Sequence, residues 1–281
     1  MYICRNCGKQ FRGGSRMDDV LLWKDYLTDN RTVSSLSGQY NCSERTIRRH
    51  LRLVVDSFAP TYPKTAILEI DTTYFSRKFG VMLFQDAVTG TILYRKYVRN
   101  ETNRDYLDGI DIIGGNGTII RGVVCDGRMG LIQAIDFCPV QMCQFHQQRI
   151  IRRLITNNPR LPAGIELLSL SRKMHSLGKK TFTDTFEKWC YKWKTFLNER
   201  TLLPSGNTTY THRRLRSARK SIQAHLQWLF TYEDYPDIGL PNTTNMLEGF
   251  NSQLKRALLN HNGLNERNKK KFIDGFLNLK K

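Results

Sequence analysis

The chain has 281 residues and a mass of 32.8 kDa, which allows one large domain with a smaller one attached. Hydrophobic residues make up 40% of it and aromatic residues 11%, which excludes an intrinsically disordered chain. Lysine and arginine (44) outnumber aspartate and glutamate (25), and the net charge of +19 favours a polyanionic partner, either nucleic acid or an anionic membrane surface.

The sequence contains no run of about 18 apolar residues, and its N-terminus lacks the apolar stretch of a signal peptide. We therefore expect neither a membrane-spanning nor a secreted protein. The seven cysteines are scattered and odd in number, which indicates reduced thiols in a cytoplasm or nucleoid, or in a nucleus if the source is eukaryotic.

Basic charge is concentrated in one part of the chain. Residues 61–146 carry 9 basic and 9 acidic side chains, whereas residues 147–232 carry 17 and 4. This contrast is typical of a neutral scaffold with a polyanion-binding insertion. A solvated basic surface without a partner is the alternative.

The first 14 residues contain Cys4 and Cys7 followed by Gly8, the pattern of a zinc-ribbon knuckle. Zinc requires four ligands, and no second pair lies close by in the sequence. Either the other half lies outside this chain or the knuckle is empty. Cys4 and Cys7 are thus candidate Zn²⁺ ligands of a partial knuckle.

Residues 15–60 are predicted to form a helix-turn-helix domain. Apolar residues recur at helical spacing over 18–27 and 32–40, and Ser43 is a good N-cap for a third helix. The outward face of that helix is basic, which suits entry into the major groove of DNA. A plain three-helix scaffold is the alternative. The arginines on that face are Arg45, Arg48, Arg49 and Arg52.

The chain then changes to short β-like runs, which lie at 67–75, 81–88, 92–98, 119–125 and 140–145. Tight turns join the first three into an antiparallel meander. Predicted helices over 103–113 and 129–135 flank the fourth run and make the later strands parallel. Three hairpin strands followed by strand–helix–strand predict an α/β, ribonuclease-H-like fold, with its first part over residues 61–160.

Residues 163–230 are predicted to be wholly helical, which makes 161–235 an all-α basic insertion. Two apolar stripes within it are expected to form core, and Arg213 and Arg214 are candidates for DNA binding. Residues 236–281 are expected to return to the ribonuclease-H-like core with a helix carrying Glu248 and a C-terminal helix.

Two aspartates lie where this fold would bring them together. Asp71 lies within an apolar strand, and Asp126 follows the fourth strand. Each alone is more often a turn-capping residue, but the first and fourth strands are expected to be neighbours. Two such charges about 4 Å apart repel by roughly 4 kcal/mol at a dielectric constant near 20. Oxygen ligands alone favour Mg²⁺ or Mn²⁺.

Glu248 is the candidate for a third carboxylate, from a late helix packed on the sheet. The alternative is that Asn245 caps this helix and Glu248 completes a capping box. Lys255 and Arg256 follow seven and eight residues later. Lys255 shares a helix face with Glu248, and both basic residues are candidate phosphate contacts.

Four short motifs carry a resemblance to a known family. They are EIDTTY at 69–74, VCDG at 124–127, CQFH at 143–146 and TNMLEGFN at 244–251. Over most of residues 60–281, the chain resembles the Mutator-like superfamily of Asp-Asp-Glu transposases, in its bacterial insertion-sequence branch. The resemblance implies that Asp71, Asp126 and Glu248 are a catalytic triad holding two Mg²⁺ or Mn²⁺ ions.

The CQFH motif resembles the family's Cys-x-x-His signature. For Cys143 and His146 we expect a structural or hydrogen-bonding role beside the site, and a contribution of His146 to catalysis stays open.

The function implied is that of a DNA transposase. It would bind terminal inverted repeats, cleave DNA in a metal-dependent reaction and transfer strands into double-stranded target DNA, with two subunits acting together on paired ends. Two other classes remain open: a domesticated DNA-binding regulator without catalysis, and a ribonuclease-H-like, structure-specific nuclease.

Overall fold

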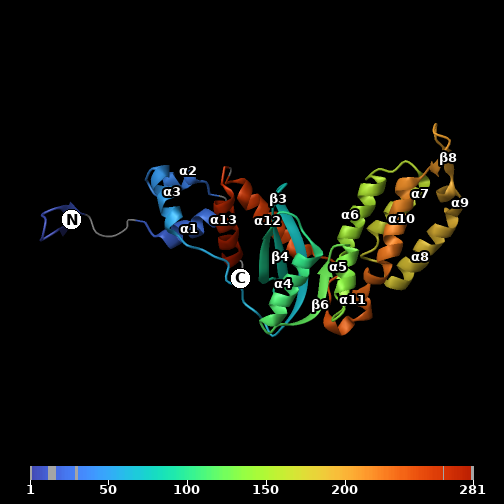
Figure 1. Cartoon of the computed structure of the whole chain (residues 1–281), viewed down its shortest axis with the longest axis horizontal. Helices are drawn as coiled ribbons and strands as arrows, with labels where there is room; N and C mark the ends of the chain where they lie inside the picture. The colour runs from blue at the N-terminus through green and yellow to red at the C-terminus, as the bar shows by residue number, and fades with distance from the viewer. Residues whose placement is uncertain (1, 12–16, 29–30, 262, 280–281) are drawn as a thin grey trace. The chain divides into compact units, whose positions relative to one another are not determined.

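The computed structural model describes residues 2–11, 17–28, 31–261 and 263–279 (Figure 1). It divides the chain into two compact units, residues 60–250 and residues 1–59 with 251–281. The sequence assigns 236–281 to the sheet domain, whereas the structure groups 251–281 with the N-terminal helices. The five-domain division stays a prediction, and its boundary between residues 14 and 15 lies outside the described residues.

A five-stranded mixed sheet forms the centre of the larger unit, in the order β5-β4-β3-β6-β7. Its strands are β3 Thr65–Ser76, β4 Phe79–Asp86, β5 Ile92–Val98, β6 Ile119–Cys125 and β7 Val140–Met142. The first three are antiparallel, and β6 and β7 are parallel to β3. The predicted mixed α/β sheet, with a meander followed by parallel strands, is thus confirmed. The fifth strand is shorter than predicted, because a helix begins at Gln144.

The turn between β4 and β5 shows how the sequence fixes the meander. Gly90 takes a φ of +76° there, a conformation that favours glycine. Asp86 is buried at the end of β4, where its side chain accepts hydrogen bonds from the backbone N–H and the hydroxyl of Thr89. A further bond from the N–H of Ile67 ties the turn to β3.

Two crossover helices follow the meander. They are α4 Asn103–Gly115 and α5 Met129–Ala134. Thr102 and Asp105 form a capping box at the start of α4. Figure 1 shows α4 lying across the strands. Gly109 permits this close packing, because a Cβ there would lie 2.2 Å from the ring of Phe84.

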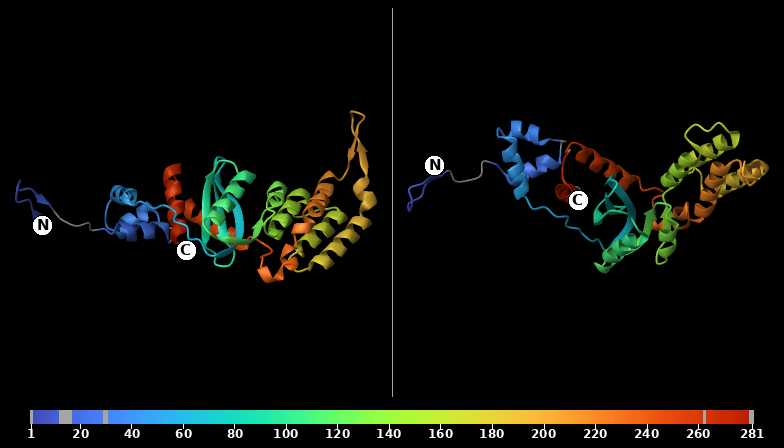
Figure 2. Two further views of the ribbon diagram at one scale, coloured as in Figure 1. Left: turned by 60° about the horizontal axis from the view of Figure 1, so that its bottom comes forward. Right: turned by 45° about the horizontal axis from the view of Figure 1, so that its top comes forward.

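The segment after β7 is mostly helical. Its helices are α6 Gln144–Ile155, α7 Pro162–Arg172, α8 Lys179–Lys192, α9 Lys194–Asn198, α10 Arg213–His225 and α11 Thr231–Asp234, with single turns η1 Leu226–Trp228 and η2 Pro236–Ile238. Figure 2 shows α6, α7, α8 and α10 as one bundle. Phe182, Phe186 and Trp189 stack in sequence along α8 and are buried, so the predicted apolar stripe is core.

A β-hairpin interrupts this segment, so the prediction of a wholly helical, all-α insertion is wrong here. Strands β8 Arg200–Leu202 and β9 Thr208–Tyr210 pair in antiparallel register. Gly206 takes a φ of +78° in the connecting turn. Threonines in both strands favour extended backbone, and Pro204-Ser205-Gly206 supplies the turn. These local signals override the helical periodicity on either side.

The smaller unit contains four helices and a two-stranded ribbon within the described residues. They are α1 Asp19–Leu27, α2 Val33–Gln39, α3 Glu44–Leu53 and α13 Glu266–Leu279, with β1 Tyr2–Ile3 and β2 Gln10–Phe11. Ser43 caps α3 as predicted, because its hydroxyl accepts the N–H of Thr46. α12, Asn245–Leu259, begins in the larger unit and ends in the smaller one. The helix-turn-helix role of α1 to α3 stays a prediction.

No helix in the described ranges combines the length and the apolar character needed to cross a bilayer.

Candidate active site

Asp71 on β3 and Asp126, directly after the end of β6, lie at neighbouring positions on adjacent chain segments. The parallel register of β3 and β6 pairs Glu69 with Val124, and each aspartate lies two residues further along its chain. Neighbouring strands are about 4.8 Å apart, so the two carboxylates start from adjacent backbone positions. Burial, then the charge of Glu248 and then that of Asp126, raise the pKa of Asp71, as expected for neighbouring acids.

Glu248 reaches the same place from the first turn of α12. The N–H of Leu247 donates to Oε2 of Glu69 at 2.9 Å, which holds the start of this helix on β3. A carboxylate is a favourable partner there, because the first N–H groups of a helix lack acceptors within it. Burial raises the pKa of both Asp71 and Glu69, and the charge of Glu248 raises each further. Asp71 is therefore close enough to interact with both Asp126 and Glu248, although among the described residues the three acids do not form a group whose ligand atoms all lie within 4.8 Å of one another.

The capping-box explanation of Glu248 is wrong. Asn245 is already the first helical residue of α12, so it is not the N-cap. The backbone N–H of Glu248 instead donates to the carbonyl of Thr244 at 2.9 Å. The hydroxyl of Thr244 also donates to Oε1 of Glu248 at 3.4 Å. Thr244, the residue before the helix, thus holds Glu248 through its carbonyl and its hydroxyl, and Oε2 of Glu248 is not used in either bond.

Burial raises the pKa values of these acids, and the charges of nearby acids add to the shift at Asp71 and Asp126. Burial raises the pKa of Asp71 to about 7, with further contributions from Glu248 and then Asp126. The pKa values of Asp126 and Glu248 are also raised, in both cases mainly by burial. Ionised carboxylates in such a place require a proton or a cation. The donor set, made only of carboxylate oxygens, fits a hard divalent cation.

Cys143 and His146 lie beside Glu248, at the start of α6. One potential ligand atom from each of these three residues lies within 4.8 Å of the others. The Cys143 thiol accepts hydrogen bonds from the N–H and the hydroxyl of Thr244, both at 3.3 Å. Burial raises the pKa of this thiol, so it is protonated at neutral pH. Cys143 thus joins α6 to the loop that holds Glu248, while its predicted role stays a prediction.

His146 faces the carboxylate of Glu248 as an uncharged ring. Its Nδ1 lies 3.6 Å from Oε1 of Glu248 and has no hydrogen-bond partner among the described residues. Burial lowers the pKa of His146 to about 4, with a further contribution from the positive charge of Arg149. At neutral pH this pair is therefore an imidazole next to a carboxylate, and no salt bridge forms.

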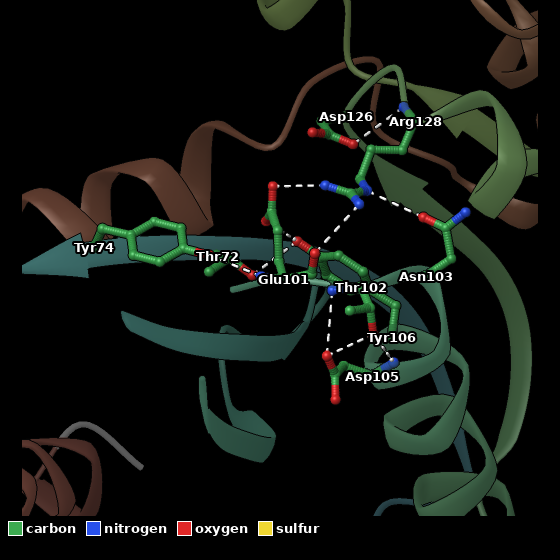
Figure 3. Close-up of polar contacts among 9 residues, drawn as sticks. All are labelled: Thr72, Tyr74, Glu101, Thr102, Asn103, Asp105, Tyr106, Asp126 and Arg128. Atoms are coloured by element: carbon green, nitrogen blue, oxygen red, sulfur yellow. Dashed lines mark hydrogen bonds and ion pairs between the residues drawn. The ribbon is translucent and has the colours of Figure 1, made fainter. Parts of the chain in front are cut away.

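Another carboxylate, Glu101, also belongs to this region, and sequence reasoning missed it. It lies between β5 and α4, and its charge raises the pKa of both Asp71 and Asp126. Arg128 holds it in an ion pair of 2.7 Å, as Figure 3 shows. Neither residue stands out in the sequence, because each lies in a loop without periodicity.

Glu69 was also missed as a functional residue, although a signal for it was present. It lies two positions before Asp71 on the same strand, and residues at that spacing share a face. A second acid on the face of Asp71, in an otherwise apolar strand, indicates a second partner. That partner is the start of α12.

The predicted DNA-contacting side chains are all exposed within their own units. Of those on α3, Arg48 pairs with Glu44 at 2.7 Å. The exposed residues are Arg45, Arg48, Arg49 and Arg52 on α3, Arg213 and Arg214 on α10, and Lys255 and Arg256 on α12. Their contact with DNA stays a prediction.

Cys4 and Cys7 lie in a tight turn between β1 and β2. The N–H of Gly8, which has a φ of +64°, donates to the carbonyl of Cys4. Backbone hydrogen bonds from Asn6 and Cys7 lower the pKa of the Cys4 thiol. A lowered thiol pKa suits metal binding, and zinc at this turn stays a prediction.

No family model matches the sequence, and no curated protein matches it. Among solved structures, the chain is similar to the HTLV-2 integrase catalytic core domain in complex with magnesium. The trimeric form of that domain gives a TM-score of 0.23 at 14% identity and covers 53% of this chain and 96% of its own. The dimeric form gives 0.23 at 12%, covering 56% and 98%.

A simian T-cell lymphotropic virus intasome gives a TM-score of 0.24 at 12% identity, covering 72% of this chain and 65% of its own. All three are retroviral integrase structures. The fold described above rests on the strand order and register of the chain itself.

Proposed function

We propose that this protein is a DNA transposase of the Asp-Asp-Glu type, which cuts DNA and joins the ends to a target. The observation that carries the proposal is the approach of Glu248 on α12 and of Asp126, which follows β6, to Asp71 on β3, whose pKa is raised to about 7 by burial first and then by the charges of Glu248 and Asp126. In this proposal all three are metal ligands and catalytic residues.

Divalent cations fit these residues because they remove the cost of placing three ionised acids together. Two Mg²⁺ or Mn²⁺ ions would supply an activated oxygen nucleophile and stabilise the leaving oxygen. The residues of the chain itself would fix the ligands. Glu69 holds the start of α12, and the N–H of Arg128 donates to Oδ1 of Asp126 at 3.2 Å.

The partner in this proposal is double-stranded DNA. The net charge of +19 supports it, with 17 basic and 4 acidic side chains in residues 147–232 alone. Helices α1 to α3 would recognise terminal inverted repeats through the arginines of α3, and α10 would contact the backbone. Two copies of the chain would act together on paired ends, and Cys4 and Cys7 would hold Zn²⁺.

The test is incubation of the purified protein with Mg²⁺ or Mn²⁺ and oligonucleotides that carry the DNA flanking its coding sequence. Asp126→Asn should reduce cleavage at least about 1,000-fold, because it removes a ligand required for the chemistry. The matched control is Asp136→Asn, an exposed aspartate of the same unit, which should cleave as the wild type does.

Three outcomes would replace the proposal. Cleavage that survives Asp126→Asn would remove the acidic site from the chemistry. A wild type that cleaves but never joins precut ends to target DNA would be a structure-specific nuclease of the same fold. A wild type that binds the DNA without cleaving it in either metal would be a regulator.

A further inference from the structure

The pair formed by Glu101 and Arg128 lies at the acidic site, and the proposed function leaves it without a role. Arg128 follows Asp126 by two residues, at the start of α5, and Glu101 precedes α4. Their side chains are 29% and 27% exposed, so water screens the pair only in part. Burying charged groups costs desolvation energy, so a half-buried ion pair beside the proposed metal ligands needs an explanation.

Arg128 is turned away from the aspartate next to it in the chain. Its guanidinium donates to Oε1 of Glu101 at 2.7 Å and to Oδ1 of Asn103 at 3.1 Å. A longer bond of 3.4 Å reaches the backbone carbonyl of Glu101. Only the backbone N–H of Arg128 contacts the Asp126 carboxylate. Figure 3 shows the side chain directed to the loop before α4.

Glu101 is itself held in place from the opposite side. The hydroxyl of Tyr106 donates to Oε2 of Glu101 at 3.0 Å and also bonds to the hydroxyl of Thr72 at 2.8 Å. The backbone N–H of Glu101 donates to the hydroxyl of Tyr74 at 2.9 Å. Tyr106 is buried, and Thr72 and Tyr74 belong to β3. The carboxylate that receives Arg128 is therefore anchored to the strand that carries Asp71.

An arginine this close to a metal-binding carboxylate is a competitor for it. A guanidinium forms strong, often bidentate, hydrogen bonds with carboxylates, and Arg128 is tethered two residues from Asp126. Without the Glu101 carboxylate, only two neutral acceptors, the Asn103 amide and a backbone carbonyl, would hold the guanidinium, and an ionised Asp126 would be the stronger acceptor. Glu101 supplies an ionised acceptor and offsets the charge of Arg128.

We infer that Glu101 is a positioning residue that keeps the guanidinium of Arg128 away from Asp126, so that the Asp126 carboxylate stays open to a divalent cation. This inference rests on the proposed function, because it takes Asp126 as a ligand. It predicts that the harm done by losing Glu101 comes from Arg128 and disappears when Arg128 is also removed.

The experiment measures Mn²⁺ affinity of the full chain, without DNA, from the electron paramagnetic resonance signal of free Mn²⁺. Glu101→Ala should bind Mn²⁺ roughly tenfold more weakly, as expected for loss of a residue that orients a ligand. Arg128→Ala should bind at least as tightly as the wild type. The double variant should return to within about twofold of the wild type, because the effects of two interacting residues do not add.

Asp108→Ala is the matched control, because Asp108 is a partly exposed acid of α4, the helix that follows Glu101, and pairs with Lys96 instead. It should leave the affinity unchanged. If Glu101→Ala does not fold, Glu101→Gln and its double variant with Arg128→Gln take its place, since the amide keeps the shape of the side chain.

Two results would overturn the inference: Glu101→Ala binding as the wild type does, or a double variant as weak as Glu101→Ala alone. The second result would make Glu101 a brace or a ligand in its own right. Asp126→Asn separates this failure from failure of the proposed function. If Asp126→Asn binds Mn²⁺ as the wild type does, the acidic site itself is wrong.

Discussion

The acidic site on the central strands and the helical segment of the larger unit differ in how they place charged side chains. At the acidic site, Asp71 and Asp126 lie partly buried among other acids, and burial raises their pKa values. In the helical segment most of the buried side chains are aromatic or aliphatic, as with Phe182 and Trp189, while Arg213 and Arg214 are exposed.

This difference indicates that the acidic site is suited to binding a cation, whereas the exposed arginines are suited to binding a polyanion. Burying like charges costs stability, and an arrangement of this kind persists where a ligand relieves the cost. Exposed arginines cost little and attract a polyanion at long range. The comparison predicts that substitutions at the acidic site alter how stability depends on pH and on divalent cations. Substitutions on α10 should instead alter DNA affinity and its dependence on salt.

The largest effect is expected at the acidic site, where the protein without divalent cations should lose stability as pH rises. The pKa of Asp71 is about 7 in the folded protein, against a usual value of 3.8. Between these values the folded state holds a proton that the unfolded state has released, so stability falls as pH rises from about 4 to 7. The loss is up to about 4 kcal/mol, at about 1.4 kcal/mol for each pKa unit.

Denaturant unfolding at pH 5 and pH 8 in a chelator measures this loss. Asp71→Asn should reduce the difference between the two pH values, whereas the exposed Asp136→Asn should not. Adding Mg²⁺ at pH 8 should restore stability to the wild type, because a ligand that binds only the folded state stabilises it. A wild type that is more stable at pH 8 than at pH 5 in the chelator would contradict the electrostatic account of this site.

A smaller effect is expected on α10. Replacing Arg213 and Arg214 together by alanine should weaken DNA binding roughly tenfold and reduce the slope of log affinity against log salt by about 2, since each phosphate contact contributes about 0.9. The thermal unfolding temperature should not change, because both side chains are exposed. Fluorescence anisotropy at several salt concentrations measures it, and an unchanged slope would remove α10 from the DNA interface.

The smallest effect is expected for an exposed ion pair on the helical segment. Nζ of Lys192 lies 2.6 Å from Oε1 of Glu166, with side chains 59% and 41% exposed. Lys192→Ala should lower the free energy of unfolding by less than about 1 kcal/mol, because water screens such a pair. The same measurement on Arg128→Ala, which removes the half-buried pair with Glu101, provides the comparison. If Lys192→Ala lowered the free energy of unfolding by more than about 2 kcal/mol, the contrast between exposed charges on the helical segment and half-buried charges at the acidic site would be wrong.

The sheet could be predicted because its signals are local. Apolar runs separated by turns such as Thr89-Gly90 define its strands, and the length of each connection sets whether neighbours are antiparallel or parallel. The convergence of Asp71 and Asp126 followed from that topology. The hairpin at 200–210 was equally local, but its strands are only three residues long and lie between strong helical patterns.

The partners of the site could not be predicted, because they come from distant parts of the chain. Glu69 accepts a hydrogen bond from Leu247, which lies 178 residues later in the sequence. Glu101 accepts one from Arg128, which is separated from it in the sequence by α4 and β6. No periodicity marks such pairs. His146 shows an intermediate case, since its motif was visible but its position 3.6 Å from Glu248 depends on packing between α6 and α12.

A crystal structure of the protein soaked with Mn²⁺, with anomalous scattering recorded, tests the central claim most directly. The account predicts Mn²⁺ bounded by carboxylate oxygens of Asp71, Asp126 and Glu248, and its loss in Asp126→Asn. Mn²⁺ bound by His146 and Glu248 without either aspartate, or no bound Mn²⁺ at millimolar concentration, would contradict it.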